Sequence, residues 1–330
     1  MNRFKAGSQE PDIEPEAHAR VDVHQHLWPP GLVEALRGRD APPRLRGWTL
    51  ELPGQRAGEE DPRDHDPELR ARQATAAGLT LALISLSSAL GIESLAPDEA
   101  APLLSAYHDG ALELPAPYGA WAAAGLVEID PGALARELDR GFAGLQLPAS
   151  ALADSAGYEG AGPLLALLEQ RRRPLLIHPG PAAPAGAGTP AWWPAMVDYV
   201  QQMHAAWYAF RVHGRARHPR LSVCFAMLAG LAPLHGERFR ARAGQGSKLD
   251  EQVFLETSSY STRAIDATIR VLGVDVLVNG SDRPYAAPLE AQLSPATSAA
   301  LHRSNPFRLL LPEEVTDAPA PLAGAAVARS

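Results

Sequence analysis

Short apolar runs recur along the chain and are separated by segments in which apolar residues have helical spacing. The runs have the length and the β-branched or alternating content of strands. They lie at residues 21–26, 79–87, 125–129, 142–148, 174–178, 221–228, 253–260 and 274–280. Two of the segments between them begin with an aspartate followed by proline, at Asp66 and Asp130, which is typical of a helix start. This alternation predicts an α/β protein with a parallel sheet.

The count of strand-and-helix units favours a closed sheet. Eight units fit a (β/α)8 TIM-type barrel, which typically occupies about 250 residues, and a doubly wound open sheet is the alternative. Candidate ligands end the first, fifth and eighth runs, and only a barrel brings those three strand ends around one mouth. We expect a single barrel domain over residues 20–312, with disordered tails over 1–19 and 313–330.

Composition and charge exclude some classes of partner. The chain is 46% hydrophobic and 21% charged with a net charge of -8, which argues against nucleic-acid binding through clustered cations. The single cysteine, Cys224, excludes an intrachain disulfide and indicates a reducing compartment. No apolar window reaches the roughly 18 residues of a membrane span, and the first 19 residues do not resemble a secretory signal. We expect a cytoplasmic protein with a small-molecule substrate and no membrane partner, and a homodimer is possible.

Two histidines stand two residues apart at the end of the first run. Because side chains alternate along a strand, His24 and His26 project from the same face, close enough for both imidazoles to reach one ion. Asp22 is expected beneath them on that face, where a carboxylate can orient an imidazole. Taken alone, either histidine can also be a hydrogen-bonded core residue.

Two further candidates end later strands. His178 closes the apolar run 174–178, at the end of a barrel strand where such enzymes keep their chemistry, although a buried packing histidine is the alternative. Asp282 follows the run 274–280, where it can be a turn or capping residue. A carboxylate at that position can instead bind a metal ion and accept a proton from metal-bound water.

Five motifs follow one another in the order found in a known family. They are Val-Asp-Val-His-Gln-His-Leu, Gly-Phe-Ala-Gly-Leu-Gln-Leu-Pro, Leu-Ile-His-Pro-Gly, His-Pro-Arg-Leu-Ser-Val-Cys-Phe-Ala and Asn-Gly-Ser-Asp-Arg-Pro, between about residues 21 and 310. They resemble the amidohydrolase superfamily, in the amidohydrolase-related branch that includes aminocarboxymuconate-semialdehyde decarboxylase. The resemblance implies a barrel with one divalent ion, commonly Zn²⁺, held by His24, His26, His178 and Asp282. Family members with two ions often use a carboxylated lysine on the fourth strand, but that run has Gln146 and no lysine.

The chain departs from the family at the sixth run. Relatives usually carry a histidine there, as acid/base or substrate contact, and Met227 stands in its place. A thioether cannot carry a proton and binds borderline ions poorly. His235, which follows this run, is a candidate replacement, with a solvated histidine as the alternative. Cys224 is expected to face the helical layer. The candidate substrate-binding residues are Arg44, Trp48, Trp192, Met227 and Arg283.

Three functions remain open at this point. The leading prediction is a metal-dependent hydrolase of a small lactone, ester or amide, in which metal-activated water attacks and Asp282 takes the proton, because this chemistry needs no histidine on the sixth strand. The alternative is a non-oxidative decarboxylase of a small carboxylated ring or muconate-type acid. The third is a catalytically degenerate barrel that binds a ligand. Sequence motifs of serine hydrolases, phosphate-binding loops and dinucleotide-binding folds are absent.

Overall fold

The structure is a computed structural model that describes residues 19–184, 186, 188–243, 250–286 and 292–311. Apart from Ala19, the predicted tails lie outside these residues. Within them, eight strands form the barrel, in chain order β1 (Val21–Gln25), β5 (Leu81–Ile84), β6 (Tyr118–Ala120), β7 (Leu145–Pro148), β8 (Leu175–His178), β9 (Val223–Phe225), β10 (Val253–Glu256) and β11 (Leu277–Val278). A small antiparallel sheet follows the first helix, with strands β2 (Arg44–Arg46), β3 (Thr49–Glu51) and β4 (Gly58–Glu59).

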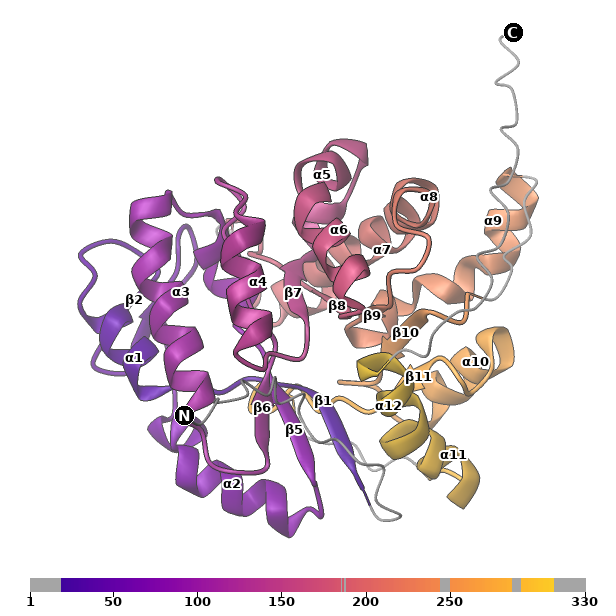
Figure 1. The fold of residues 1–330 in the computed structure, drawn as a ribbon, viewed down its shortest axis with the longest axis horizontal. Coiled ribbons are helices and arrows are strands. Elements are labelled where there is room, and N and C mark those ends of the chain that lie inside the picture. Colours follow the sequence, from indigo (N-terminus) through magenta and orange to yellow (C-terminus); the bar gives the residue numbers. More distant parts are fainter. Residues whose placement is uncertain (1–18, 185, 187, 244–249, 287–291, 312–330) are drawn as a thin grey trace, which may run out of the picture.

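Helices surround the strands (Figure 1). They are α1 (Pro30–Arg37), α2 (Pro67–Ala76), α3 (Pro97–Leu112), α4 (Pro131–Asp139), α5 (Ser155–Gly160), α6 (Gly162–Arg171), α7 (Tyr199–Ala209), α8 (Arg215–Arg217), α9 (Gly236–Ala243), α10 (Thr262–Leu272), α11 (Pro295–Ala299) and α12 (Asn305–Leu310). The expected capping aspartates are present, since Asp66 accepts from Leu69 N and Asp130 from Ala133 N, both at 2.9 Å. Among the described residues, no helix is long and apolar enough to cross a membrane.

Shorter helical segments join these elements. The 3-10 segments are η1 (Pro62–His65), η2 (Ser88–Leu90), η3 (Ile92–Ser94), η4 (Ala149–Leu152) and η7 (Met227–His235). The π segments are η5 (Pro194–Asp198), η6 (Phe210–Gly214) and η8 (Ala300–Ser304). Because η5, α7, η6 and α8 follow one another directly, residues 194–217 form one long interrupted helix after β8.

The barrel is closed, as predicted. Its strands pair in parallel in two arcs, β1-β5-β6 and β7-β8-β9-β10-β11. A bridge between Ala122 and Leu145 joins the arcs on one side. On the other side, Val23 N donates to Asn279 O at 2.9 Å and a bridge pairs Gln25 with Arg283, so β1 meets the chain that follows β11. An open doubly wound sheet would leave these two edges apart.

One predicted strand is wrong. Residues 125–129 form no strand and bend at 126–128, and the third barrel strand is β6, which ends at Ala120. Val127 made this segment look like a strand, but its side chain is 61% exposed. Between β5 and β7 the barrel instead needs a small residue at Gly119. A Cβ at Gly119 would already stand 3.0 Å from Leu83 Cδ2, so tight packing rather than β propensity selects this strand.

The side chain of Cys224 lies inside the barrel rather than toward the helices. It belongs to a buried cluster with residues from most of the strands, namely Val21, Val23, Leu83, Trp121, Leu176, Phe254 and Val278. Its neighbour Phe225 faces the helices instead, 5.3 Å from the ring of Trp207. The predicted orientation of Cys224 is therefore wrong. Strand alternation extended as far as Met227 predicts the opposite orientation, but β9 ends at Phe225 and the backbone turns at Met227.

Arg70 of α2 stabilises the closing seam, which is the edge where β1 meets the chain that follows β11. It is only 3% exposed. Its Nη1 donates to the carbonyl oxygens of His26 at 3.1 Å and Asp64 at 2.6 Å. Its Nη2 donates to Gln25 Oε1 at 2.9 Å and to Arg283 O at 3.4 Å. One guanidinium thus ties the end of β1 to the chain that follows β11, where the candidate ligands lie.

Asp22 completes this seam through backbone amides. Its Oδ1 accepts from His24 N and from Ser281 N, both at 3.1 Å, and its Oδ2 accepts from Gln25 Nε2 at 2.8 Å. The register of β1 shifts between Asp22 and Gln25, which turns Asp22 away from the imidazoles. The expectation that Asp22 orients an imidazole from beneath is therefore wrong, and its contribution is to hold the strand end in place.

We expect Arg70→Met to lower the free energy of unfolding by about 2–4 kcal/mol, because buried acceptors lose their donors. Urea unfolding followed by circular dichroism measures the change. Arg72→Met is the matched control, since Arg72 is exposed on the same helix, and it should change stability by no more than about 0.5 kcal/mol. Equal stability of the two variants would show that the seam does not depend on Arg70.

Candidate metal centre

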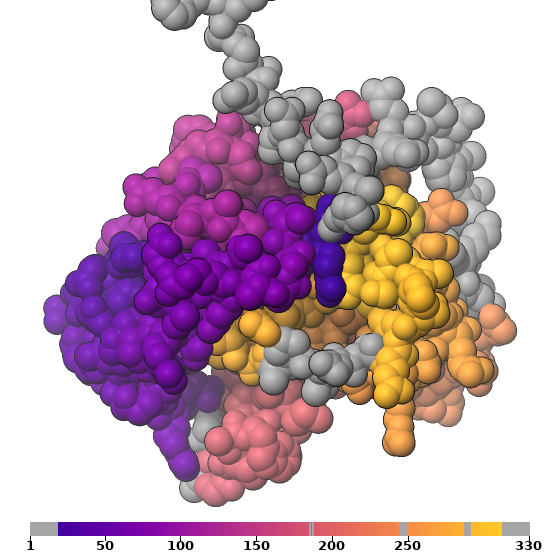
Figure 2. Space-filling view, turned by 90° about the horizontal axis from the view of Figure 1, so that it is seen from below, coloured from indigo at the N-terminus to yellow at the C-terminus, as the bar shows by residue number. Residues whose placement is uncertain are grey.

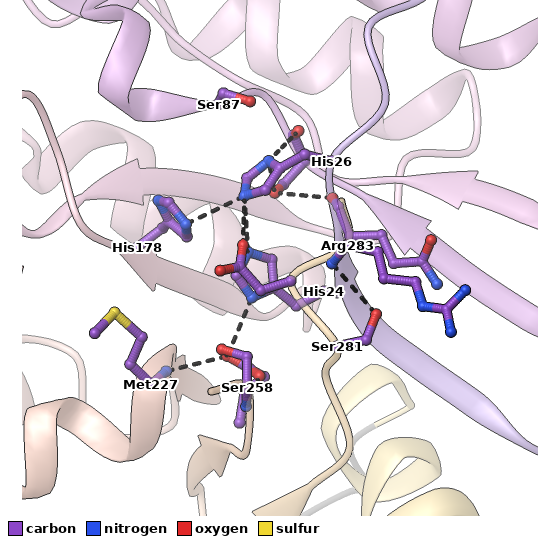
Figure 3. Close-up of polar contacts among 12 residues, drawn as sticks. His24, His26, Ser87, His178, Met227, Ser258, Ser281 and Arg283 are labelled. Atoms are coloured by element: carbon purple, nitrogen blue, oxygen red, sulfur yellow. Dashed lines mark hydrogen bonds and ion pairs between the residues drawn. The ribbon is translucent and has the colours of Figure 1, made fainter. Parts of the chain in front are cut away.

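The structure brings the four predicted ligands together at the mouth of the barrel. His24 Nε2 and His26 Nε2 are 3.1 Å apart, and His26 Nε2 and His178 Nε2 are 3.3 Å apart. Asp282 Oδ1 lies 3.2 Å from His26 Nε2 and 3.7 Å from His24 Nε2. All four ligand atoms lie within 4.8 Å of one another. Figure 3 shows the three histidine side chains pointing toward one another.

Hydrogen bonds determine which ring nitrogens carry protons. His26 Nδ1 lies 3.1 Å from Ser85 O, and His178 Nδ1 lies 2.8 Å from Pro179 O. Because a carbonyl oxygen only accepts, each Nδ1 must donate, and each Nε2 keeps its lone pair. Burial lowers the pKa of both histidines, so both rings are neutral near pH 7. Two lone pairs therefore face each other across 3.3 Å.

This arrangement fits one divalent cation. Ligand atoms about 2.0–2.1 Å from a tetrahedral ion lie about 3.3–3.4 Å from each other. Four of the six separations, 3.1, 3.2, 3.3 and 3.7 Å, bracket that value, and all six are at most 4.8 Å. A cation also removes the repulsion between the converging lone pairs, and imidazole nitrogens with one carboxylate are usual ligands of divalent transition metals.

Glu256, at the end of β10, is a functional residue that the sequence reasoning missed. It is fully buried, and its Oε2 lies 3.1 Å from His24 Nδ1. The same oxygen accepts from Met227 N at 3.1 Å and from Ser258 Oγ at 2.9 Å. A Cβ at Gly280 would overlap the Glu256 side chain, so glycine is required there. A glutamate ending an apolar strand was the available signal, because a buried carboxylate needs partners.

Glu256 changes the protonation of His24. Burial by itself would lower the pKa of His24, but the carboxylates of Glu256 and Asp282 outweigh burial and raise this pKa to about 9. His24 without a metal ion is therefore protonated near pH 7. Its Nδ1–H donates to Glu256 and its Nε2–H points at His26 Nε2. A proton and a metal ion thus compete for one lone pair of His24.

The position of the missing sixth-strand histidine has an unusual backbone. Residues 227–231 all have positive φ, from 48° at Leu228 to 64° at Leu231. Left-handed geometry costs roughly 1–2 kcal/mol for each residue other than glycine. The turn directs the amide of Met227 at Glu256, and His204 Nε2 lies 2.7 Å from Gly230 O. A buried carboxylate thus occupies the space beside Met227.

A cavity of about 490 Å³ lies on the mouth side of the barrel, although none of the four candidate ligands lines it. Its walls come from the small antiparallel sheet and from the loops after β5 and β8, and are mostly apolar. They include Leu52, Leu90, Pro181, Ala195 and Tyr199. Burial and the Asp282 carboxylate raise the pKa of Tyr199, which places Tyr199 within electrostatic range of the candidate ligands. The cavity can therefore serve as the substrate pocket.

The predicted acid/base histidine is not brought to the four ligands. His235 is exposed at the end of η7, with its ring 5.3 Å from that of His204. The turn at residues 227–231 redirects the chain after β9, and His235 follows that turn. The geometry gives its proposed catalytic role no support.

The structure also relocates the predicted substrate residues. Arg44 pairs with Glu51 at 2.7 Å on the small sheet. Trp48 is parallel to the ring of His65 at 5.9 Å and packs against the core, whereas Trp192 is 57% exposed. Figure 3 shows the Arg283 side chain pointing away from the histidines. Met227 alone stands beside the centre, through its backbone amide.

No family model and no curated protein matches this chain. Solved structures match its fold. Apo IDCase of Metarhizium anisopliae is 17% identical, with a TM-score of 0.68 over 89% of this chain and 97% of that one. The 5-carboxyvanillate decarboxylase of Novosphingobium aromaticivorans, with manganese and 3-methoxy-4-hydroxy-5-nitrobenzoic acid bound, is 18% identical, with a TM-score of 0.69 over 89% and 97%. An amidohydrolase II is 16% identical, with a TM-score of 0.66 over 88% and 99%.

The chain has the fold of these enzymes. This confirms the resemblance and the predicted barrel. It also corrects the leading functional prediction, a metal-dependent hydrolase of lactones, esters or amides, because several solved structures with this fold are decarboxylases, for 5-carboxyvanillate and for 2,6-dihydroxybenzoate. The hydrolase prediction rested on Met227 in place of the sixth-strand histidine, and one side chain on a shared fold does not assign a reaction class.

Removing one candidate ligand should remove the metal ion. We expect His178→Ala and Asp282→Ala to purify with little or no divalent metal, measured by inductively coupled plasma mass spectrometry, because each deletes one of four converging ligands. His235→Ala is the matched control and should retain the wild-type content. If all three variants keep the wild-type content, the ion is held elsewhere.

Metal affinity should depend on pH in a defined direction. Because the pKa of His24 is raised to about 9, binding displaces a proton below that pH. The apparent affinity should therefore rise about tenfold per pH unit between pH 7 and 9 and level off above. In Glu256→Gln the pKa of His24 falls, and this slope should flatten. Calorimetric titrations with a chelator as competitor measure both, and identical slopes would refute the coupling.

Proposed function

We propose that this protein is a non-oxidative, divalent-metal-dependent decarboxylase of a small carboxylated ring or muconate-type acid. The observation that carries the proposal is the convergence of three histidine Nε2 atoms and Asp282 Oδ1 at one mouth. It gains support from the fold, which is shared with decarboxylases for 5-carboxyvanillate and 2,6-dihydroxybenzoate. Fold alone does not assign an activity, so the four ligand atoms are the main argument.

His24, His26, His178 and Asp282 would hold the ion, which when bound would supply positive charge for a carboxylate or hydroxyl oxygen of the substrate. We favour Zn²⁺, because imidazole ligands with tetrahedral spacing suit it. Mn²⁺ is the alternative, because a 5-carboxyvanillate decarboxylase and a dihydroxybenzoic acid decarboxylase with this fold contain manganese. Metal analysis of the purified protein separates the two.

Asp282 is the residue we assign to proton transfer. Decarboxylation breaks the bond between a carbon atom and its carboxylate, releases carbon dioxide, and leaves an electron pair on that carbon that must take a proton. Burial opposes ionisation of Asp282, yet the neighbouring imidazole of His26 and the positive charge of His24 lower its pKa. Asp282 is therefore ionised near pH 7 and can take a proton from the substrate or water and deliver it to the carbon.

Glu256 would act as a positioning residue. Its Oε2 already lies within hydrogen-bond distance of His24 Nδ1, Met227 N and Ser258 Oγ, and Ser258 N also donates to Oε1. A carboxylate with all these donors is poorly suited to give up or take a proton during turnover. It can instead hold the ring of His24 in its ligand orientation.

The apolar cavity on the mouth side of the barrel favours this reaction class. With a ring bound, walls such as Leu52, Leu90 and Pro181 would shield it from water. A carboxylate loses hydration on entering such a site, whereas the departing carbon dioxide is neutral, so an apolar pocket with a cation at one end favours its release.

The cellular setting, the domain bounds and the oligomeric state remain proposals. We infer a reducing, cytoplasmic setting from the single buried cysteine, Cys224. A single barrel domain over residues 20–312 and a homodimer also stay predictions. Limited proteolysis and light scattering test these two.

A direct assay tests the proposed activity. Protein loaded with Zn²⁺ or Mn²⁺ is incubated with a panel of hydroxybenzoic and muconate-type acids, and released carbon dioxide is measured. We expect turnover of at least one acid, a loss of at least about 100-fold in Asp282→Asn, and wild-type rates in His235→Ala. A protein that binds metal but releases no carbon dioxide from any acid would support the ligand-binding barrel instead.

A further inference from the structure

A second cavity lies on the opposite side of β1 from the candidate metal centre. Its volume is about 410 Å³, and it is bounded by β1, α2, η8 and the segments that follow β10 and β11. Asp22 and Gln25 face it, whereas the intervening His24 turns toward the metal centre. Figure 2 shows this side of the molecule, where the first residues of β1, in indigo, lie between purple segments and the yellow C-terminal helices.

The cavity wall carries more positive than negative charge. Arg20, Arg70 and Arg283 line it, and Asp22 is its one carboxylate among the described residues. The oxygens of Asp22 are occupied by the two backbone amides and the Gln25 amide described above. In the part of the chain that the structure describes, no carboxylate lies within ion-pair distance of any of these arginines. The positive potential is therefore available to an anion.

The three arginines have different roles. Arg70 donates to four acceptors, three of them backbone carbonyls. It therefore contributes positive electrostatic potential to the cavity more than a direct contact with a bound anion. The guanidinium of Arg283 is half-buried and has no hydrogen-bond or ion-pair partner among the described residues. Arg20 is exposed at the rim. Arg283 and Arg20 can therefore donate to a carboxylate, and a guanidinium can do so through two parallel bonds.

The rest of the cavity wall is suited to an apolar group attached to a carboxylate. The buried hydroxyl of Tyr118 lies beside the guanidinium of Arg70. Apolar side chains line the cavity as well, including Ala74, Leu79, Ile265, Leu293 and Leu301. The volume lies in the range of small-molecule sites, about 300–1,000 Å³. An inorganic anion would leave the apolar wall without contact.

We propose that this cavity is a second binding site for a small organic acid, with the carboxylate against Arg283 and Arg20 and an apolar body against α2 and η8. The site is separate from the candidate metal centre but close to it along the chain. Arg283 directly follows Asp282, and its carbonyl oxygen accepts from His26 N at 2.6 Å. A bound acid would thus contact the residue that adjoins two candidate metal ligands.

Calorimetric titration of the full-length protein with benzoate, benzamide and inorganic phosphate tests this site. We expect benzoate to bind at least tenfold more tightly than benzamide, which lacks the charge, and than phosphate, which lacks the apolar body. Arg283→Met should weaken benzoate binding at least tenfold, and Arg20→Met should weaken it less. Arg72→Met, on the exposed face of α2, should leave it unchanged.

A second variant distinguishes this cavity from the metal centre. Benzoate bound in the cavity should persist in His178→Ala, whereas benzoate bound at the metal centre should be lost. Binding that survives both Arg283→Met and Arg20→Met, or that disappears in His178→Ala, overturns the proposal. So does the absence of binding at millimolar benzoate, or an equal affinity for phosphate. Unchanged urea midpoints of the arginine variants show that any loss of binding is not unfolding.

Discussion

The seam between β1 and the chain that follows β11 is the constraint on which the rest of the structure depends. Arg70 ties two backbone carbonyls of this seam and the side chain of Gln25 together, and Asp22 binds amides on both sides of it. Residues more than 250 positions apart in the chain meet only because this edge closes. These contacts satisfy buried polar groups whose loss of partners would be costly, and they stabilise the seam for that reason.

The candidate centre is the functional consequence of that closure. Two neutral imidazoles direct lone pairs at each other because backbone carbonyls hold their Nδ1 protons. The third, His24, is held by Glu256 and takes a proton in the absence of a metal ion. A bound cation removes the repulsion between the two lone pairs and takes the place of the proton on His24. The same geometry thus accounts for metal binding, its expected pH dependence and the role of a glutamate that ends a neighbouring strand.

Much of the fold could be predicted from local patterns. All the predicted runs except 125–129 coincide with barrel strands, and both aspartate caps are present. The failures share a cause. Val127 looked like a strand residue and Cys224 was assigned to the helical layer, because each argument extended a local periodicity beyond the point where the backbone bends. Packing of the closed barrel overrides such preferences.

The sequence by itself determined the order of strands and helices and the group His24, His26, His178 and Asp282, because strand periodicity and strand ends are local properties of a chain. Only the tertiary structure decided that Glu256 supports His24 and that Arg283 faces a second cavity. It also decided that His235 is exposed, away from the candidate ligands. These outcomes depend on which strands become neighbours and which way a side chain turns at a bulge, and both follow from barrel closure.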